Sequence, residues 1–385
     1  MGQAKNPNPN AETDFRLIDS QTGLAAFIQK AAEARMIAVD VEGDSMFHFQ
    51  EKVCLIQMAA NGSTAVIDPL ALHDLDDLKP LFASPSIRKI IHGADYDVRS
   101  LYRDFGIRIE NLFDTQLASM FMGWQETSLE AVVARRFSVE LDKRCQKKDW
   151  SMRPLPDDMA AYAALDVVHL IPLAKALMSE LEQKGRLDWV IEECRLLSQV
   201  RPADNHDDPL FMKFKGAGRL EPRQLAALEA LLQLRCAIAR QKDRPLFKVI
   251  GNPTLKKIAL ALPTTLDELK ASSEMSDKQM DMYGRAVMEA LRNVHNIPPD
   301  ELPRYPRHRS PRISNRVPPR VKLLRAWRDR KAERLELNPA LVLNRALIKA
   351  IAVENPKDMA ALTNVEGINQ WQVQAFGREI LKTLK

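Results

Sequence analysis

The sequence predicts an α/β domain with a mixed central sheet, followed by two small all-α domains. Two observations carry this prediction. Residues 14 to about 200 hold short apolar runs that come first in succession and then alternate with amphipathic stretches. Strand signals cease after about residue 210, where long helical patterns take over. Strands that precede a strand–helix alternation are typical of a mixed sheet flanked by helices.

The composition is that of a soluble protein of two or three domains. The chain has 385 residues, is 45% hydrophobic and carries a formal net charge of +5, which permits an anionic partner. Its four cysteines form no C-x-x-C pair, so neither a zinc site nor a disulfide framework is indicated. No apolar run is long enough for a membrane span. We therefore expect a cytoplasmic protein with a disordered lead-in over residues 1–13, no membrane contact and no obligate protein partner.

Four apolar runs are the strand candidates, and several amphipathic stretches are the helix candidates. The strands are expected at 36–42, 52–59, 63–69 and 87–93. The helices are expected at 74–83, 97–106, 156–177 and 220–243. Pro222 lies near the first turn of the last of these, where proline is tolerated. The stretch 156–177 is expected to form one long helix.

Two acids interrupt the first strand. Asp40 and Glu42 are two residues apart in "MIAVDVEG", so both side chains lie on one face of the strand. Two buried carboxylates on one face repel each other. Either they lie at an exposed strand end, or a cation lies between them. Carboxylate oxygens suit Mg²⁺ or Mn²⁺.

Further acids occupy similar settings. Asp97 begins the helix that follows "KIIHG", and an acid near a positive helix end is the simpler explanation for it. Tyr162 and Asp166 are four residues apart, hence on one helix face. Asp166 lies among Ala, Leu and Val, where an acid needs a partner such as a metal. Tyr162 is equally compatible with a half-buried core position. His92 is expected to be structural.

The two helical regions are predicted to be a repeat. When the first is shifted by 93 residues, apolar, proline and glycine positions coincide, and these positions set packing and helix ends. The coinciding pairs include Ile258 with Ile351, Pro263 with Pro356, Leu269 with Leu362, Gly284 with Gly377 and Leu291 with Leu384. The alternative is a chance alignment of two helical segments.

Several motifs resemble a known family. "VDVEG", "HGADYD" and "YAALD" are similar to the three motifs of the DEDD exonuclease superfamily, in its tyrosine-bearing branch. "KVCLIQMA", "FDTQLAS", "LDKRCQKKDWSMRPL" and the segment 214–252 resemble ribonuclease D, the last being like its HRDC domain. The resemblance covers residues 14 to 385. It departs from the family at Val41, where many members have Thr, and in the short stretch 43–51.

The resemblance implies a fold, a reaction and a set of site residues. The fold would be an RNase H-like exonuclease domain followed by two HRDC-type domains, the second more divergent. Asp40, Glu42, Asp97 and Asp166 would ligate two divalent metal ions, Mg²⁺ or Mn²⁺, and Tyr162 would position the attacking water. The activity would be 3′-to-5′ exoribonuclease, releasing nucleoside 5′-monophosphates during 3′ maturation of tRNA precursors and other small structured RNAs with free 3′ ends.

Basic residues are the candidates for substrate binding. One set precedes the Tyr162 helix, and another lies in the Pro- and Arg-rich segment 302–330; the candidates are Lys143, Arg144, Lys147, Arg153, Arg304, Arg307 and Arg309. The alternative for the second set is a solvated connector between domains. The expected boundaries are 14–200 for the exonuclease domain, 214–295 and 321–385 for the HRDC-type domains, and 296–320 for the linker. Two rival functions are a DNA-directed exonuclease and a non-catalytic RNA-binding protein.

Overall fold

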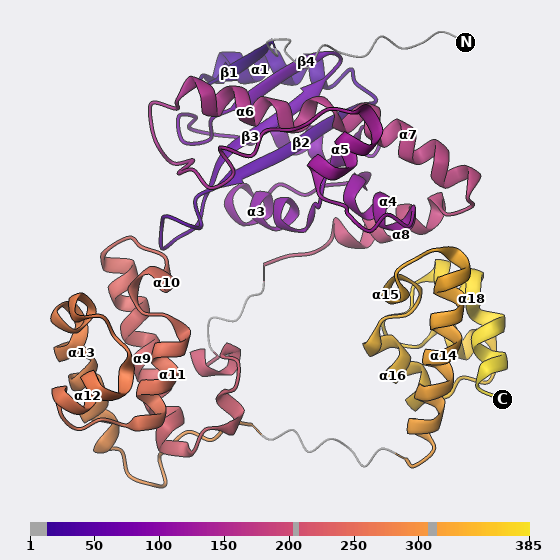
Figure 1. Cartoon of the computed structure of the whole chain (residues 1–385). Helices are drawn as coiled ribbons and strands as arrows, with labels where there is room; N and C mark the ends of the chain where they lie inside the picture. Colours follow the sequence, from indigo (N-terminus) through magenta and orange to yellow (C-terminus); the bar gives the residue numbers. More distant parts are fainter. Residues whose placement is uncertain (1–13, 203–207, 307–313) are drawn as a thin grey trace. The chain divides into compact units, whose positions relative to one another are not determined.

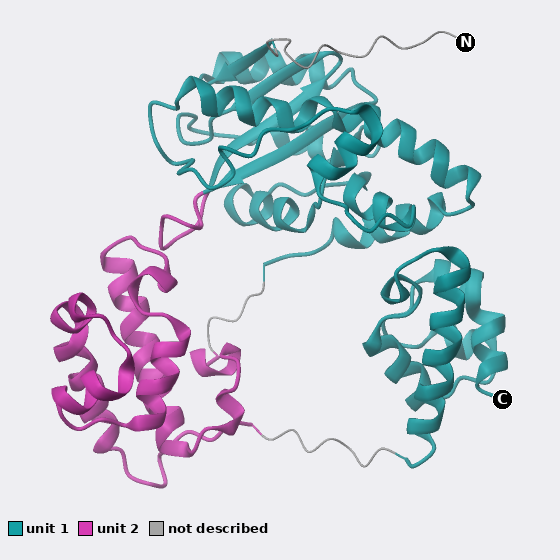
Figure 2. Ribbon diagram, viewed as in Figure 1, with its two compact units in different colours: residues 1–43, 53–202, 311–385 teal, residues 44–52, 203–310 magenta. Residues whose placement is uncertain are grey.

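The computed structural model describes residues 14–202, 208–306 and 314–385 (Figure 1). The predicted disordered lead-in, residues 1–13, lies outside these ranges. The chain divides into two compact units (Figure 2). One comprises residues 1–43, 53–202 and 311–385, and the other comprises residues 44–52 and 203–310.

A six-stranded sheet forms the centre of the first unit, with the strand order β1-β4-β3-β2-β5-β6. The strands are β1 (Phe15–Ile18), β2 (Met36–Gly43), β3 (Val53–Ala60), β4 (Ser63–Ile67), β5 (Arg88–Ile91) and β6 (Leu112–Asp114). Strand β3 pairs antiparallel with β2 and β4, and the other pairings are parallel. The mixed sheet predicted from the sequence is therefore confirmed.

Eight helices belong to this sheet domain among its described residues. They are α1 (Gln21–Ala31), α2 (Leu78–Ala83), α3 (Asp95–Phe105), α4 (Thr115–Phe121), α5 (Leu129–Phe137), α6 (Asp157–Val168), α7 (Leu170–Gln183) and α8 (Leu187–Leu197). Helix α6 packs on β2, β3 and β4, while α7 packs on β2, β5 and α4. Helix α6 thus lies over the strand face that presents the predicted acids.

The single long helix predicted over 156–177 is wrong. The structure has two helices, α6 and α7, with His169 between them. Pro172 gives the reason, because proline lacks the N–H that would continue the ladder and its ring clashes with the carbonyl four residues earlier. Together, residues 157–183 are long and apolar enough to cross a membrane by length and composition alone. Because both helices pack on the sheet, we interpret them as core helices.

The helical regions repeat the same order of elements. The first has two 3₁₀ turns, Leu210–Lys213 and Ala217–Arg219, then α9 (Pro222–Gln241), α10 (Leu246–Val249), α11 (Asn252–Ala261), α12 (Leu266–Ser273) and α13 (Asp277–His295). The second has α14 (Val317–Leu335), α15 (Pro339–Val342), α16 (Arg345–Glu354), α17 (Met359–Thr363) and α18 (Gln370–Thr383).

The 93-residue register predicted from the sequence holds for the start of four of the five helix pairs. Helix α11 begins at Asn252 and α16 at Arg345, and even their left-handed end residues, Leu262 and Asn355, keep the spacing. The exception is α14. It begins at Val317, two residues later than a shift of 93 residues from Pro222 gives. Pro318 and Pro319 fall in its first turn, where no intrahelical N–H is needed.

The second helical region shares its core with the sheet domain. Trp189 of α8 stacks on Trp371 of α18 with ring centroids 4.7 Å apart. Both carboxylate oxygens of Glu192 accept hydrogen bonds from backbone N–H groups at the start of α18, from Gln370 at 2.7 Å and Trp371 at 2.9 Å. Glu193 accepts the indole N–H of Trp371 at 2.8 Å. These contacts join α8 and α18 within one compact unit.

Candidate active site

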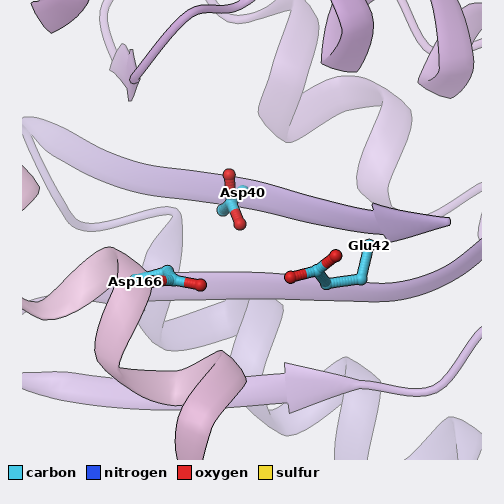
Figure 3. A group of neighbouring side chains, drawn as sticks. All are labelled: Asp40, Glu42 and Asp166. Carbon is cyan, nitrogen blue, oxygen red and sulfur yellow. The ribbon is translucent and has the colours of Figure 1, made fainter. Parts of the chain in front are cut away.

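Three of the predicted acids meet at one point. Asp40 and Glu42 come from β2, and Asp166 comes from α6, which covers that strand (Figure 3). One oxygen from each carboxylate lies within 4.8 Å of the other two. Together with Tyr162 they line a pocket of about 410 Å³. The strand spacing and the helix spacing, each read separately from the sequence, therefore bring these residues to a single site.

Asp97 is not among these three acids and does not line the pocket. It occupies the first turn of α3 and is buried. The backbone N–H of Val41 hydrogen-bonds to the carboxyls of both Asp97 and Asp40. The charge of Asp97 also contributes to the raised pKa of Glu42. Asp97 is therefore the fourth carboxyl of the same cluster.

Asp114 holds the turn that positions Asp97, and sequence reasoning missed it. Its carboxylate accepts the backbone N–H groups of Gly93 and Ala94, both at 2.9 Å, just before α3. It also accepts the N–H of Gln116 at 2.8 Å and so caps α4. Gly93 has φ +76°, a left-handed conformation that favours glycine. The available signal was the "FDTQ" pattern, in which an Asp after a short apolar run is a typical helix cap.

The four carboxyls have raised pKa values because they lie together in a partly buried site without a compensating cation among the described residues. Burial is the largest cause throughout. It raises the pKa of Asp40 to about 7. Burial and the neighbouring acids raise the pKa of Glu42 to about 9 and that of Asp166 to about 8. The pKa of Asp97 is also raised, by burial and then by Asp40. A divalent cation would reverse these shifts, so the donor set fits such an ion.

Tyr162 lies beside the acids on the same helix face as Asp166. Its side chain is buried, and its ring lies 6.0 Å from that of Trp150. Burial, followed by the charges of Asp166 and Glu42, raises the pKa of the Tyr162 hydroxyl. The hydroxyl therefore stays protonated at neutral pH and is suited to hydrogen bonding rather than to proton abstraction.

His92 lines the pocket but is held by the fold. Its Nε2–H donates to the backbone carbonyl of Thr127 at 2.9 Å, and Nδ1 lies 2.9 Å from Oγ1 of Thr115. Burial lowers the pKa of His92. Both ring nitrogens are thus engaged, in agreement with the structural role expected from the sequence.

The rim of the pocket carries two of the basic candidates. Lys143 forms an ion pair with Glu130 at 2.9 Å, and Glu130 itself lines the pocket. Arg144 pairs with Asp142, another lining residue, and 87% of its side chain remains exposed. Sequence reasoning missed Glu130, because "SLE" signals only the start of a helix. Lys147 is also exposed.

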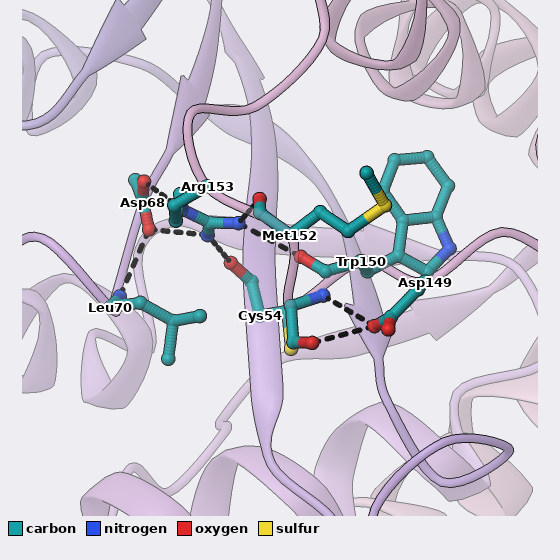
Figure 4. A network of polar contacts seen from close by, with 8 residues as sticks. Cys54, Asp68, Leu70, Asp149, Trp150, Met152 and Arg153 are labelled. Atoms are coloured by element: carbon teal, nitrogen blue, oxygen red, sulfur yellow. Dashed lines mark hydrogen bonds and ion pairs between the residues drawn. The ribbon is translucent and has the colours of Figure 1, made fainter.

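Arg153, the remaining candidate of this set, is occupied by the fold (Figure 4). Its guanidinium donates two hydrogen bonds to the buried carboxylate of Asp68, both at 2.6 Å. It donates further bonds to the backbone carbonyls of Cys54, Trp150 and Met152. All these partners lie within the sheet domain. The structure therefore gives Arg153 a structural role in place of the predicted phosphate contact.

Only one of the three linker candidates falls in the described part of the chain. Arg304 is exposed. Arg307 and Arg309 lie outside the described residues.

The fold and the acidic pocket define the class of the protein, a 3′-to-5′ exonuclease with appended helical domains. A family described as "3'-5' exonuclease" matches residues 15–182, and the HRDC domain matches residues 224–291 and 318–384. The chain is similar to ribonuclease D of Escherichia coli (strain K12), with 30% identity, covering 75% of this chain and 77% of the relative. It is 29% identical to ribonuclease D of Acidiphilium cryptum, covering 95% and 92%.

A solved structure agrees with these relatives. The crystal structure of E. coli RNase D, described as an exoribonuclease involved in structured RNA processing, matches with a TM-score of 0.72 and 25% identity, covering 96% of this chain and 98% of that one. The chain belongs to the ribonuclease D family. It is a 3′-to-5′ exoribonuclease, and both predicted HRDC-type domains are confirmed as parts of its fold.

Proposed function

We propose that this exoribonuclease is metal-dependent and that Asp40, Glu42, Asp97 and Asp166 hold two divalent cations, Mg²⁺ or Mn²⁺. The meeting of three carboxylates from two elements within 4.8 Å supports the proposal most directly. Four carboxylates carry about −4, which two such ions balance. When bound, the ions supply the positive charge that activates a water and stabilises the departing 3′-oxygen.

The protein's own groups have distinct tasks in this proposal. The four carboxylates bind the two cations. Because they lie on β2, α3 and α6, their positions determine where the scissile phosphate lies. Tyr162 orients the attacking water through its protonated hydroxyl. The products are nucleoside 5′-monophosphates, removed one at a time from a free 3′ end.

The proposed substrates are tRNA precursors and other small structured RNAs. Lys143, Arg144 and Lys147 support this, because they place positive charge at or near the pocket rim. Arg304, Arg307 and Arg309 are proposed to contact phosphates farther along the RNA. We also propose a cytoplasmic location and the domain limits 14–200, 214–295 and 321–385.

A digestion experiment tests the function. A 3′-extended tRNA and a DNA oligonucleotide of the same length are incubated with the protein in Mg²⁺ and in chelator. We expect stepwise shortening of the tRNA from its 3′ end in Mg²⁺ alone, with the DNA largely intact and a 3′-phosphorylated RNA resistant. Faster loss of DNA would support the alternative of a DNA-directed exonuclease. Internal cutting of a circular RNA would contradict exonuclease action.

A further inference from the structure

Gln57, in the middle of β3, has a buried side chain with no internal partner. It is 0% exposed, yet neither Oε1 nor Nε2 has a hydrogen-bond partner among the described residues. No other buried side chain in the described ranges has two such atoms. Burying an amide without hydrogen bonds is costly, and buried polar groups in native folds are nearly always satisfied. The exception calls for a specific cause.

The register of the sheet places Gln57 directly against the acid cluster. It is the cross-strand partner of Asp40 in the antiparallel β2–β3 pair. Directly opposed residues point to the same face with Cβ atoms roughly 5 Å apart. The next pair on that face is Glu42 with Leu55. Gln57 does not line the pocket itself, and helix α6 packs on both strands of this pair. The register therefore places the Gln57 amide beside Asp40 in the sheet.

Gln372 is a second buried glutamine, and it differs from Gln57 in its hydrogen bonds. Gln372 is 5% exposed, and its Nε2 donates to the carbonyl of Val342 at 3.0 Å. Its Oε1 accepts the backbone N–H of Asn369 at 3.0 Å. Both of its functional atoms are therefore satisfied by the protein alone, whereas those of Gln57 are not.

A metal-bound Asp40 carboxylate would give the Gln57 amide the hydrogen-bond acceptor that it lacks. A carboxylate that gives one oxygen to a cation orients well only when a hydrogen-bond donor holds it, and loss of such a donor typically weakens metal binding. We propose that Gln57 is a positioning residue of the metal site, whose Nε2–H donates to the Asp40 carboxylate when a divalent cation is bound. This inference rests on the proposed function, since it requires that Asp40 be a ligand.

The test uses metal binding without RNA. Mn²⁺ is titrated by calorimetry into the chelator-treated full chain, as wild type, Gln57→Met and Gln372→Met. We expect Gln57→Met to bind Mn²⁺ about 10- to 100-fold more weakly. Its metal-free melting temperature should be unchanged or higher, because an unsatisfied amide has been removed. Gln372→Met should show the opposite pattern, with a lower melting temperature and wild-type affinity. Gln57→Leu repeats the test if the Met variant folds poorly.

The outcomes separate this inference from the proposed function. If wild type binds Mn²⁺ and Gln57→Met binds it within twofold of the same affinity, Gln57 is not a positioning residue. A melting temperature lowered in metal-free Gln57→Met, with normal affinity, would likewise overturn the inference and leave Gln57 a structural role through a buried water. If wild type itself binds no Mn²⁺, the proposed metal site fails instead.

Discussion

Burial governs the chemistry of individual residues at this site. An acid surrounded by water would ionise freely, but Asp40, Glu42 and Asp166 are only partly exposed and lie beside one another, with the buried Asp97 close enough to raise the pKa of Glu42. The same burial keeps the Tyr162 hydroxyl protonated. Charge state therefore follows from which elements meet, a property that no single motif reveals.

The stability of the metal-free protein should fall as pH rises. The folded chain holds protons on Asp40 up to a pKa of about 7 and on Glu42 up to about 9, above their ordinary values of 3.8 and 4.5. The folded state thus binds more protons than the unfolded state between about pH 4 and pH 9, so the free energy of unfolding decreases across that window. Thermal melts in chelator should show this decline, and Asp40→Asn with Glu42→Gln should make it shallower, because Asp97 and Asp166 still hold protons. Added Mn²⁺ should restore stability at pH 8, since metal replaces the protons. A flat wild-type profile would contradict the raised pKa values.

Replacing Tyr162 by Phe should separate water orientation from metal binding. The variant keeps the ring that packs beside Trp150 and loses only the hydroxyl. We expect single-turnover cleavage to slow by about 10²-fold, because the attacking water loses its orientation, with Mn²⁺ affinity and melting temperature near those of wild type. A variant that cleaves at the normal rate would remove Tyr162 from the proposed reaction.

Some strands and helices could be predicted from the sequence, and others could not. The strands β2, β3, β4 and β5 were predicted, because each contains a run of buried apolar residues. Strand β1 exposes two of its four residues and β6 has only three residues, so neither gave a usable pattern. The α6–α7 break was readable from Pro172 in retrospect. Asp114 was readable only as a helix cap, and Gln57 gave no signal, because the contact of each with the acid site depends on how distant segments pair.

The loop before α6 should depend on Arg153 for stability. Replacing Arg153 leaves the carboxylate of Asp68, which is only 5% exposed, without its counterion. We expect Arg153→Met to lower the free energy of unfolding by roughly 3 kcal/mol. Arg144→Met removes an exposed ion pair and should leave the free energy of unfolding near that of wild type. Chemical denaturation measures both. Equal stability of the two variants, with weaker RNA binding by Arg153→Met, would return Arg153 to the substrate-contact role.

At the scale of the whole molecule, the order of domains and the helical repeat followed from the sequence, because proline, glycine and apolar positions repeat with the helices themselves. The sequence did not indicate that the second helical region shares one hydrophobic core with the sheet domain. Trp189 and Trp371 are 182 positions apart, and nothing in either local pattern indicates that they stack.

The basic linker should determine how RNA binding responds to salt. Replacing Arg304, Arg307, Arg309 and Arg312 by Gln removes up to four phosphate contacts, and the slope of log affinity against log salt should become shallower by about 3. Fluorescence anisotropy with a structured RNA at several salt concentrations measures this slope. Neutralising the exposed residues Arg16, Lys30, Lys175 and Lys382 removes the same charge elsewhere and serves as control. An identical change in both variants would show that only net charge matters and that the linker is a solvated connector.

A parallel titration of metal binding and cleavage tests directly whether the four acids hold the ions that cleavage requires. Mn²⁺ is added to chelator-treated wild type and Asp40→Asn, and calorimetry is compared with single-turnover release of 5′-monophosphates from RNA with a free 3′-hydroxyl. We expect two ions per wild-type chain and cleavage that rises with their binding. Asp40→Asn should lose both metal binding and cleavage while it still melts as a folded protein. Cleavage by wild type in excess chelator, or near-normal cleavage by Asp40→Asn, would contradict this metal requirement.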